Sequence, residues 1–412
     1  MSVLYLTQNG ITDHIGRSQV APYVLGLAKK GYQIHVLSAE KDGRDALIAD
    51  YQRQFDAHGV RWTRIRYANW PPLFGQALTQ WRMKRAARRI IRLERIRLLH
   101  CRSFPAALIG YALKRKKGVK YIFDFRDFYA DGGLNKSRGI AWLIFRRLKQ
   151  LEGPMIREAD KIVCLTRRAR RVLEEWYLHD SGGAVARFQV IPCCADFSHF
   201  NPEIVSAEHN AAARQRAGLN ADDRVMLYLG SLGPDYLLTE MLALFRQYQA
   251  LEPAAKLLFV SNNGEELVTQ EVRRQRIPQD RVAFLSVDRS DLPAFIRLAA
   301  FSVVFIRADI SKAGCSPTKL AELFACGVPV IANSGVGDLD QIIALNRNGS
   351  VVVGDFSDGA LRAAVSAVLD QRSMGAPDIR GNSHEFSLEE GVARYAAVYA
   401  ELLDEPARRN AC

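Results

Sequence analysis

Residues 301–340 read FSVVFIRADISKAGCSPTKLAELFACGVPVIANSGVGDLD and carry the clearest structural signals of the chain. Phe301–Ile306 and Val330–Ala332 are apolar, β-branched runs of strand length. Between them, Ser316–Pro317 predicts a helix start, with the serine as N-cap and the proline in the first helical position. Gly327 predicts the left-handed residue that ends this helix. The expected unit is therefore strand, loop, helix and strand.

The loop and first helical turn of this unit are rich in cations. Arg307, Lys312 and Lys319 lie there together with the backbone N–H groups of the helix start, an arrangement suited to a bound anion. Glu322 follows one turn later, where a carboxylate can accept hydrogen bonds from the vicinal hydroxyls of a ribose. The implied ligand contains phosphates and a sugar ring, held beyond the carboxyl end of a strand. Solvated surface roles for Lys319 and Glu322 are the alternative.

Length and composition limit the classes of protein to consider. A chain of 412 residues, 48% hydrophobic and 25% charged, suits a soluble globular protein of two domains. It contains no run of eighteen apolar residues, so a membrane-spanning helix is not expected. Met1–Leu6 leads directly into a strand, and we therefore expect a cytoplasmic protein. The seven cysteines lack the spacing of a zinc or redox motif, so no metal site is expected.

The positive charge is concentrated in one region. Residues 81–120 contain fourteen Lys or Arg residues against the single acid Glu94, which equals the net charge of +13 of the whole chain. A narrow apolar stripe within 83–90 and the apolar segment Trp70–Phe74 accompany these cations. This basic region predicts contact with an anionic membrane surface or a polyphosphate-linked substrate. Motifs for nucleic-acid binding are absent, and a merely solvated basic face is the alternative.

Strand and helix signals alternate twice along the chain, which predicts two domains with parallel sheets. We expect a first domain over residues 1–196, a second over 205–380, and a final helix over 385–404 that packs on the first domain. The polar stretch Asp196–Asp223 is the expected linker. The strand-like segments are Val3–Thr7, His35–Ser38, Arg97–Cys101, Tyr121–Phe125, Lys161–Leu165, Val225–Gly230, Leu257–Ser261, Val282–Leu285, Phe301–Ile306 and Val330–Ala332.

Two common nucleotide-binding motifs are missing. No Gly-Lys-Ser/Thr of a P-loop occurs, and no complete Gly-x-Gly-x-x-Gly of a dinucleotide-binding domain. Nucleotide hydrolases and dehydrogenases are therefore not favoured.

Over nearly its full length the chain resembles family 4 of the glycosyltransferases. Seven segments carry this resemblance in the right order. They are Tyr5–Val20, His100–Ser103, Asp124–Asp127, Val190–Asp196, Leu229–Gly233, Ser316–Glu322 and Phe386–Tyr395.

The resemblance implies the GT-B fold, with two facing Rossmann-like domains. It implies a retaining transfer of a sugar from a nucleoside diphosphate sugar held by the C-terminal domain. The acceptor, held by the N-terminal domain, would be a glycan or a polyprenyl-diphosphate-linked glycan in polysaccharide or cell-envelope biosynthesis. No cofactor and no metal are expected, because the nucleotide sugar is itself a substrate. The protein would work at the inner face of the cell membrane, held peripherally by the basic region.

The resemblance also assigns donor-binding residues. Glu322 matches the second glutamate of the family's paired-glutamate motif, while Gly314 stands where the first is usual. The Arg and Lys that often clamp the diphosphate are missing from residues 231–240. Lys319 and Arg307 are then the expected catalytic cations. The remaining donor contacts expected here are Gly16, Gly230, Ser231, Lys312, Ser316 and Thr318.

In the N-terminal domain, the family's usual histidine after the strand near Phe125 is missing, and Asp124 or Asp127 is expected to take its catalytic place. Gly16 would let the loop after the first strand approach the ligand closely. The residues expected to contact the sugar or acceptor are Arg17, His100, Arg102 and Arg126. Structural ion pairs are an equal alternative for Arg126 and Asp127.

Two further functions remain open on the same scaffold. A nucleotide-sugar epimerase would consume the donor without any acceptor. A degenerate transferase, marked by Gly314 in place of the glutamate, would serve as a non-catalytic scaffold at the membrane surface.

Overall fold

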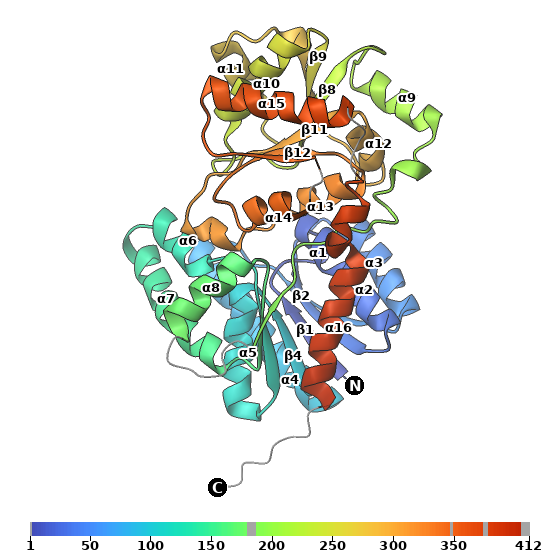
Figure 1. Ribbon diagram of the computed structural model, residues 1–412. Helices are drawn as coiled ribbons and strands as arrows, with labels where there is room; N and C mark the ends of the chain where they lie inside the picture. The colour runs from blue at the N-terminus through green and yellow to red at the C-terminus, as the bar shows by residue number, and fades with distance from the viewer. Residues whose placement is uncertain (1, 179–186, 347–348, 374–377, 405–412) are drawn as a thin grey trace. The chain divides into compact units, whose positions relative to one another are not determined.

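The computed structural model describes residues 2–178, 187–346, 349–373 and 378–404 (Figure 1). The chain divides into two compact units, which are described one at a time. The first unit comprises Met1–Pro192, Ala313–Cys315 and Leu388–Cys412. The second comprises Cys193–Lys312 and Ser316–Ser387.

The first unit is built on a sheet of seven strands in the order β3-β2-β1-β4-β5-β6-β7, all paired in parallel. Because all strands run the same way, their carboxyl ends form one edge of the sheet. The strands are β1 (Ser2–Thr7), β2 (Gln33–Glu40), β3 (Arg61–Arg66), β4 (Leu98–Arg102), β5 (Lys120–Phe125), β6 (Lys161–Cys164) and β7 (Phe188–Val190).

Helices cover this sheet. They are α1 (His14–Gln19), α2 (Ala21–Lys29), α3 (Asp45–Ala57), α4 (Pro72–Glu94), α5 (Ser103–Lys117), α6 (Tyr129–Lys136), α7 (Gly139–Glu158), α8 (Arg167–Tyr177) and α16 (Leu388–Asp404). Residues of α4, α5, α7 and α8 share one hydrophobic cluster with the sheet. The C-terminal helix α16 packs on α2, where a Cβ at Gly26 would lie 2.6 Å from Val392 Cγ2. Tyr32 Oη donates to the Ala396 carbonyl oxygen at 2.9 Å.

The second unit repeats this architecture with six parallel strands in the order β10-β9-β8-β11-β12-β13. The strands are β8 (Arg224–Leu229), β9 (Ala255–Val260), β10 (Val282–Leu285), β11 (Ala299–Val304), β12 (Val330–Asn333) and β13 (Val351–Val353). The α-helices are α9 (Ala207–Arg216), α10 (Leu238–Leu251), α11 (Glu265–Arg274), α12 (Leu292–Arg297), α13 (Thr318–Ala325), α14 (Leu339–Asn346) and α15 (Asp358–Ser373). Short 3-10 helices are η2 (Pro202–Ile204), η3 (Gln279–Arg281), η5 (Gly381–Phe386) and η4 (Ile310–Gly314), whose last two residues are grouped with the first unit.

The predicted fold class is confirmed, since both units have parallel strands with flanking helices. Sequence patterns missed the edge strands β3 and β13. β3 reads RWTRIR and is partly exposed, and β13 has only three residues, so neither forms a long apolar run. The polar stretch Asp196–Asp223, where the linker is expected, holds η2 and α9 and is grouped with the second unit.

The basic helix α4 is also organised differently from the prediction. Its apolar stripe, which includes Met83, Ala87 and Ile90, is buried in the core cluster and does not form a second apolar surface. Trp70 and Phe74 are exposed as expected, at the start of the helix. A helix beside a sheet needs one apolar face for the core, and this stripe supplies it.

Candidate functional site

The predicted anion-binding helix of the second unit is α13, and its first turn differs from the prediction. The helix begins at Thr318, and Pro317 occupies the N-cap position. Ser316 is therefore not the capping residue, because its Oγ accepts a hydrogen bond from the Cys193 backbone N–H at 3.1 Å. Gly327 adopts the predicted left-handed conformation after the helix, with φ +72°.

Lys319, in the first turn of α13, directs its ammonium toward the carboxyl end of β8. Its Nζ lies 4.4 Å from the ring centroid of Tyr228 and 4.7 Å from that of Tyr236, both within cation–π range. A Cβ at Gly230 would lie 3.1 Å from both Nζ and Cε of this lysine. Gly230 follows β8 with φ +107°, a conformation that favours glycine. The fold thus brings together Lys319 and Gly230, which are far apart in sequence.

The loop after Gly230 is fixed by an asparagine that sequence reasoning missed. Asn263 Oδ1 accepts from the Leu232 N–H at 3.1 Å, and its Nδ2 donates to the Leu232 carbonyl oxygen at 2.7 Å. Tyr228 Oη donates to the carbonyl oxygen of Ser231 at 2.6 Å, while Ser231 itself is exposed. The predicted donor-binding loop is therefore held in place on both sides by side chains of the sheet edge.

Glu322 is buried on α13 and has a cationic partner. Its Oε1 accepts from Arg289 Nη1 at 3.0 Å, and the Arg289 guanidinium lies 5.0 Å from the ring centroid of Phe200. The Arg289 carbonyl oxygen is 2.9 Å from His199 Nε2. Arg289 was missed because it lies in a polar loop after β10 without any motif. The pair places a hydrogen-bond donor and an acceptor side by side at the predicted ribose position.

The other two predicted cations, Lys312 and Arg307, contact the neighbouring turn at Pro234 and Asp235. Lys312 Nζ forms an ion pair with Asp235 Oδ2 at 2.8 Å. Arg307 donates from Nη2 to the Pro234 carbonyl oxygen at 3.2 Å, and its backbone N–H donates to the Asp235 carbonyl oxygen at 2.8 Å. Of the three cations, Lys319 is the one whose ammonium lies against the glycine at the end of β8. Asp235 already compensates the charge of Lys312, so Lys319 is the better candidate to balance a diphosphate.

Gly314, where the family's first glutamate is usual, belongs to a short segment grouped with the first unit. A Cβ there would lie 3.6 Å from Phe128 Cε2 and 3.7 Å from the Cα of Asp127, which is ordinary contact. Thr166 Oγ1 tethers this segment by donating to the Ala313 carbonyl oxygen at 2.6 Å. Asp127 is exposed beyond the end of β5 and remains accessible for the predicted catalytic role.

His100 and Asp124 lie inside the first unit, where both are buried. His100 Nδ1 is 2.7 Å from Tyr399 Oη, and its Nε2 is 3.3 Å from Asp124 Oδ2. Asp124 Oδ1 accepts from Tyr395 Oη at 3.2 Å and from Arg126 Nη1 at 3.3 Å. Burial lowers the pKa of His100, partly opposed by its bond to Asp124. Burial alone would raise the pKa of Asp124, but Arg126 and His100 hold it well below its usual range.

In the structure, the predicted ligand contacts His100, Asp124 and Arg126 bond to one another and to the tyrosines of α16. His100, Arg102 and Asp124 are still paired within β4 and β5, so their side chains meet a covered face of the sheet rather than its edge. Arg126 follows the structural alternative, bonded to Asp124 and to Tyr395 Oη at 3.4 Å. The four-residue spacing of the α16 tyrosines was the available sequence signal, because it places both on one helix face.

Gly16 has a different use from the one predicted. A Cβ there would lie 2.0 Å from the Gly10 carbonyl oxygen, so the missing side chain lets α1 pack on the turn after β1. The buried Glu40 carboxylate fixes the same turn, accepting from the Ile11 N–H at 2.6 Å. The predicted close approach thus involves the protein's own backbone. Arg17 is half-buried in the last turn of α1.

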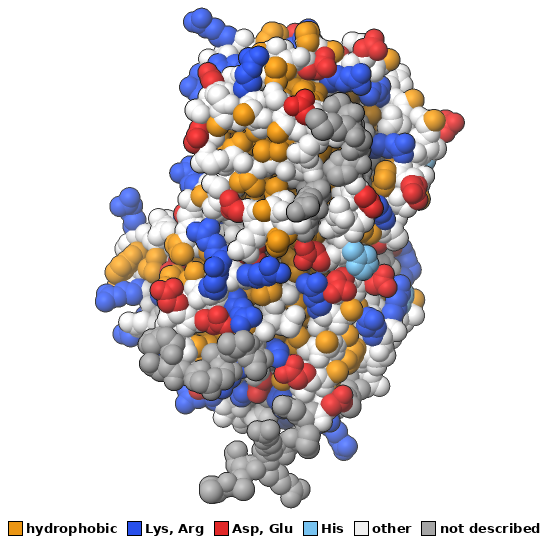
Figure 2. All heavy atoms as spheres, viewed as in Figure 1, with side chains coloured by type: hydrophobic (Ala, Val, Ile, Leu, Met, Phe, Trp, Pro, Cys, Tyr) orange, Lys and Arg blue, Asp and Glu red, His pale blue; other side chains and the backbone are white. Residues whose placement is uncertain are grey.

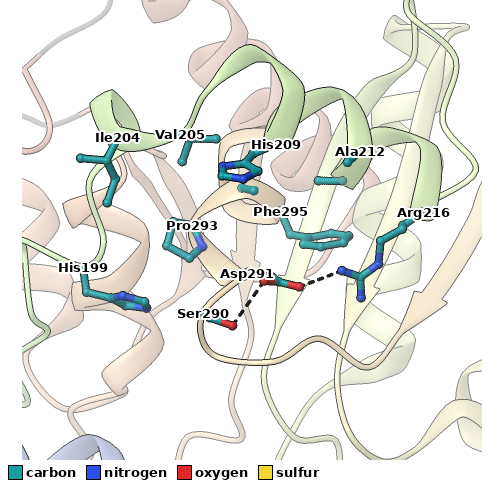
Figure 3. A pocket seen from close by; sticks show the side chains of 12 residues that line it. His199, Ile204, Val205, His209, Ala212, Arg216, Ser290, Asp291, Pro293 and Phe295 are labelled. Atoms are coloured by element: carbon teal, nitrogen blue, oxygen red, sulfur yellow. Dashed lines mark hydrogen bonds and ion pairs between the residues drawn. The ribbon is translucent and has the colours of Figure 1, made fainter.

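A hollow of about 300 Å³ lies elsewhere in the second unit, between α9 and the start of α12 (Figure 3). Asp291 crosses its rim, with Oδ2 at 2.8 Å from Arg216 Nη1 and Oδ1 accepting from Ser290 Oγ at 3.3 Å. Its lining is mainly apolar and contains none of the predicted donor residues. His199 contacts both the hollow and the Glu322–Arg289 pair. It lines the hollow, and its Nε2 lies within hydrogen-bond distance of the Arg289 carbonyl oxygen.

Comparisons with known proteins agree with this architecture. Residues 21–199 match the family described as Glycosyltransferase Family 4, and residues 210–380 match Glycosyl transferases group 1. A D-inositol 3-phosphate glycosyltransferase of Segniliparus rotundus is 24% identical over 319 residues, which cover 74% of this chain. The match covers 66% of that relative's own length, slightly less than two thirds.

Solved structures share the fold over the whole chain. Sucrose-phosphate synthase from Thermosynechococcus elongatus has a TM-score of 0.72 at 16% identity, covering 98% of this chain and 100% of its own. The Anabaena protein Alr3699/HepE in complex with UDP and glucose has a TM-score of 0.68 at 14% identity, covering 97% and 100%. At these identities the likeness establishes a common GT-B fold.

Proposed function

This chain is a family 4 glycosyltransferase of GT-B fold, and from that premise we propose that it transfers a sugar from a nucleoside diphosphate sugar with retention of configuration. The observation that carries the proposal is the position of Lys319, between two tyrosine rings at the end of β8. The start of α13 adds backbone N–H groups to the same place.

The chemical demand on this site is the stabilisation of a leaving group. As the glycosidic bond breaks, negative charge grows on the β-phosphate, so a fixed cation there stabilises the transition state more than the ground state. The tyrosine rings hold the Lys319 ammonium before substrate arrives, which limits reorganisation during the reaction. We further propose that exposed Asp127 acts near the reacting sugar.

We propose a uridine diphosphate sugar as the first donor to test. Alr3699/HepE, solved with UDP and glucose, supports this choice. In this chain, the Glu322–Arg289 pair offers a carboxylate acceptor and a guanidinium donor to the ribose hydroxyls. No metal and no cofactor are part of the proposal, and transfer should therefore survive a chelator.

The proposed acceptor is a glycan or a polyprenyl-diphosphate-linked glycan of polysaccharide or cell-envelope biosynthesis. The protein would lie peripherally on the inner face of the cell membrane, attracted by the basic residues of 81–120. Within the described residues, no helix is both long and apolar enough to cross a bilayer. The D-inositol 3-phosphate glycosyltransferase relative makes phosphorylated polyols a second acceptor class to screen.

Calorimetry with the diphosphates of uridine, guanosine and adenosine tests the donor half of this proposal. We expect one nucleotide to bind wild type and to bind Lys319→Ala at least about tenfold more weakly, from loss of a charge-assisted contact. Lys312→Ala is the matched control, because that lysine pairs with Asp235 and should change affinity little. If none of the three nucleotides binds, the proposal fails.

Donor turnover separates the two alternatives. An epimerase would release an isomerised sugar from the donor without acceptor, which NMR of the products detects. The match to group 1 transferases favours transfer. A non-catalytic scaffold would keep its cellular function in Lys319→Ala, whereas a transferase would lose it.

A further inference from the structure

The start of α7 exposes an unusual number of large apolar side chains. Ile140 is 74% exposed and Leu143 is 55% exposed, and Trp142 and Ile144 are exposed beside them. Figure 2 shows hydrophobic side chains gathered over the α6–α7 region of the first unit, with Lys and Arg around them. Single exposed apolar residues are common, but a run within five positions forms a patch that signals binding.

Packing of the helix does not require these residues. Phe145 packs the first turns of α7 against the neighbouring helix α6, with its ring centroid 5.7 Å from that of Tyr129, and Leu148 packs against the core cluster. A Cβ at Gly133 would lie 2.1 Å from Phe145 Cδ1, so α6 and α7 meet closely through that ring. The outer side chains of Ile140, Leu143 and Ile144 therefore remain outside the core that holds α7 in place.

Positive charges outnumber negative ones around the patch, where Lys149 forms ion pairs with Asp131 at 2.7 Å and with Glu152 at 3.1 Å. Residues 132–151 contain five Lys or Arg residues and no Asp or Glu. The Arg146 guanidinium lies 5.5 Å from the ring centroid of Trp142, at the border between the apolar and basic surfaces. Tryptophan and arginine in this arrangement are typical of side chains at the level of lipid headgroups.

A second exposed apolar segment, which we call the second apolar tip, lies at the start of α4. It is at the same edge of the first unit's sheet as the start of α7. Trp70 is 85% exposed and Phe74 is 68% exposed, at the start of α4. Trp81 follows on this helix with the Arg85 guanidinium 5.8 Å from its ring centroid. α4 follows β3 and ends before β4, and α7 follows β5 after the short helix α6 and ends just before β6, so the starts of both helices lie toward the carboxyl edge of the parallel sheet.

Several other cations of the 81–120 region lie toward the opposite edge, whereas Arg102 ends β4 at the carboxyl edge. α5 ends at Lys117, next to the start of β5. Lys114 there pairs with Asp160 at 2.7 Å, and Lys120 donates to the Leu402 carbonyl oxygen at 2.8 Å. The cations of the 81–120 region are therefore divided between the two edges of the sheet. Both described apolar tips lie at the carboxyl edge.

We propose that the first two turns of α7 insert into the headgroup layer of an anionic bilayer, with the Trp70–Phe74 tip as a second contact. This deepens the proposed function, because it places the carboxyl edge of the acceptor-binding unit at the membrane where a lipid-linked acceptor would be presented. An anionic lipid is favoured over a protein partner by the excess of positive charge in residues 132–151 and by the Arg146 guanidinium that lies over the Trp142 ring, even though Lys149 is paired with Asp131 and Glu152.

Flotation of the full chain with vesicles tests the proposal, using pure phosphatidylcholine or phosphatidylcholine with phosphatidylglycerol. The variant Leu143→Gln/Ile144→Gln should lower partition into anionic vesicles about 30-fold, since two branched apolar side chains lose their burial. Leu267→Gln is the matched control, because Leu267 is 53% exposed on α11 of the second unit and should not change partition.

The contribution of the positive charges to vesicle binding is tested with one double variant at each edge of the sheet. Arg146→Gln/Arg147→Gln should lower partition into anionic vesicles about tenfold and leave weak binding to phosphatidylcholine unchanged. The control Arg115→Gln/Lys116→Gln removes two exposed cations near the end of α5 and should have little effect. Equal losses in the two variants would mean that attraction by the whole basic region, and not contact through α7, holds the protein on the vesicles, and would overturn insertion by α7.

Insertion itself is measured by quenching of tryptophan fluorescence with bromolipids. Wild type should be quenched in anionic vesicles, and Trp142→Phe should lose part of that quenching. No vesicle binding together with a dimer that Leu143→Gln/Ile144→Gln dissociates would identify the patch as a protein interface and overturn the proposal. Nucleotide affinity is followed in every variant and should not change, so failure here is distinct from failure of the proposed transfer.

Discussion

Each unit joins tyrosines to a charged group, but the two arrangements differ in where they lie on their sheets. In the first unit, Tyr395 and Tyr399 of α16 cover His100 and Asp124, which are within paired strands. In the second, the tyrosine rings flank the Lys319 ammonium beside Gly230, just beyond the end of β8.

This difference shows that the position of a polar side chain along a strand decides whether it has a structural or a functional role. A side chain inside a parallel strand points at a face that helices cover, so it must find its partners within the protein. A group beyond the last strand residue reaches the edge where ligands of such sheets bind. The buried network should therefore control stability, and the lysine at the edge should control catalysis.

The largest expected effect is on turnover. Lys319→Ala should lower kcat/KM for sugar transfer by about 1,000-fold, because a preorganised cation facing the leaving group is lost. Steady-state assays with the donor found by calorimetry measure this effect. Lys319→Arg keeps the charge and should recover part of the activity; equal losses in the two variants would show that charge is not the property required.

The second effect is on stability and tests the buried network. Asp124→Ala should lower the free energy of unfolding by about 3 kcal/mol, since it leaves Arg126 and His100 buried without their carboxylate. Urea denaturation measures the change. Asp222→Ala, at an exposed position in the turn before β8, is the control and should stay within about 0.5 kcal/mol. Comparable losses would mean that the network contributes little to folding.

The third effect is a pH dependence of stability. The pKa of His100 is lowered in the folded state, so the unfolded chain binds a proton first as the pH falls. Stability should then decrease below about pH 6.5, with a slope of up to about 1.4 kcal/mol per pH unit from this group. The depressed pKa of Asp124 acts in the same direction at lower pH, where its stabilising charge is lost. Urea titrations of wild type and His100→Gln between pH 5 and 8 should differ in slope.

The smallest expected effect concerns the loop after β8. Asn263→Ala removes two hydrogen bonds to the Leu232 backbone and should weaken nucleotide binding about threefold by loosening the loop. Calorimetry measures the affinity. Asn262→Ala is a nearby control, because Asn262 is exposed and its Oδ1 accepts from Ser286 Oγ at 2.6 Å instead of from the Leu232 backbone.

Much of the fold could be predicted from sequence because buried parallel strands form short apolar runs. The central strands were found in this way, whereas the polar edge strand β3 and the three-residue β13 gave no such signal. The site was predicted less completely. Lys319 and Glu322 follow a helix start that sequence can identify, but Arg289 and Asn263 lie in loops whose partners are distant in the chain.

The sequence by itself determined the alternating strands and helices, the left-handed Gly327 that follows α13, and the excess of positive charge, because these depend on neighbouring residues. Only the tertiary structure decided that Lys319 lies against Gly230, that α16 encloses His100 and Asp124, and that the stripe of α4 belongs to the core. Such contacts join residues up to 299 positions apart. Their geometry follows from strand order and register, which local patterns leave undetermined.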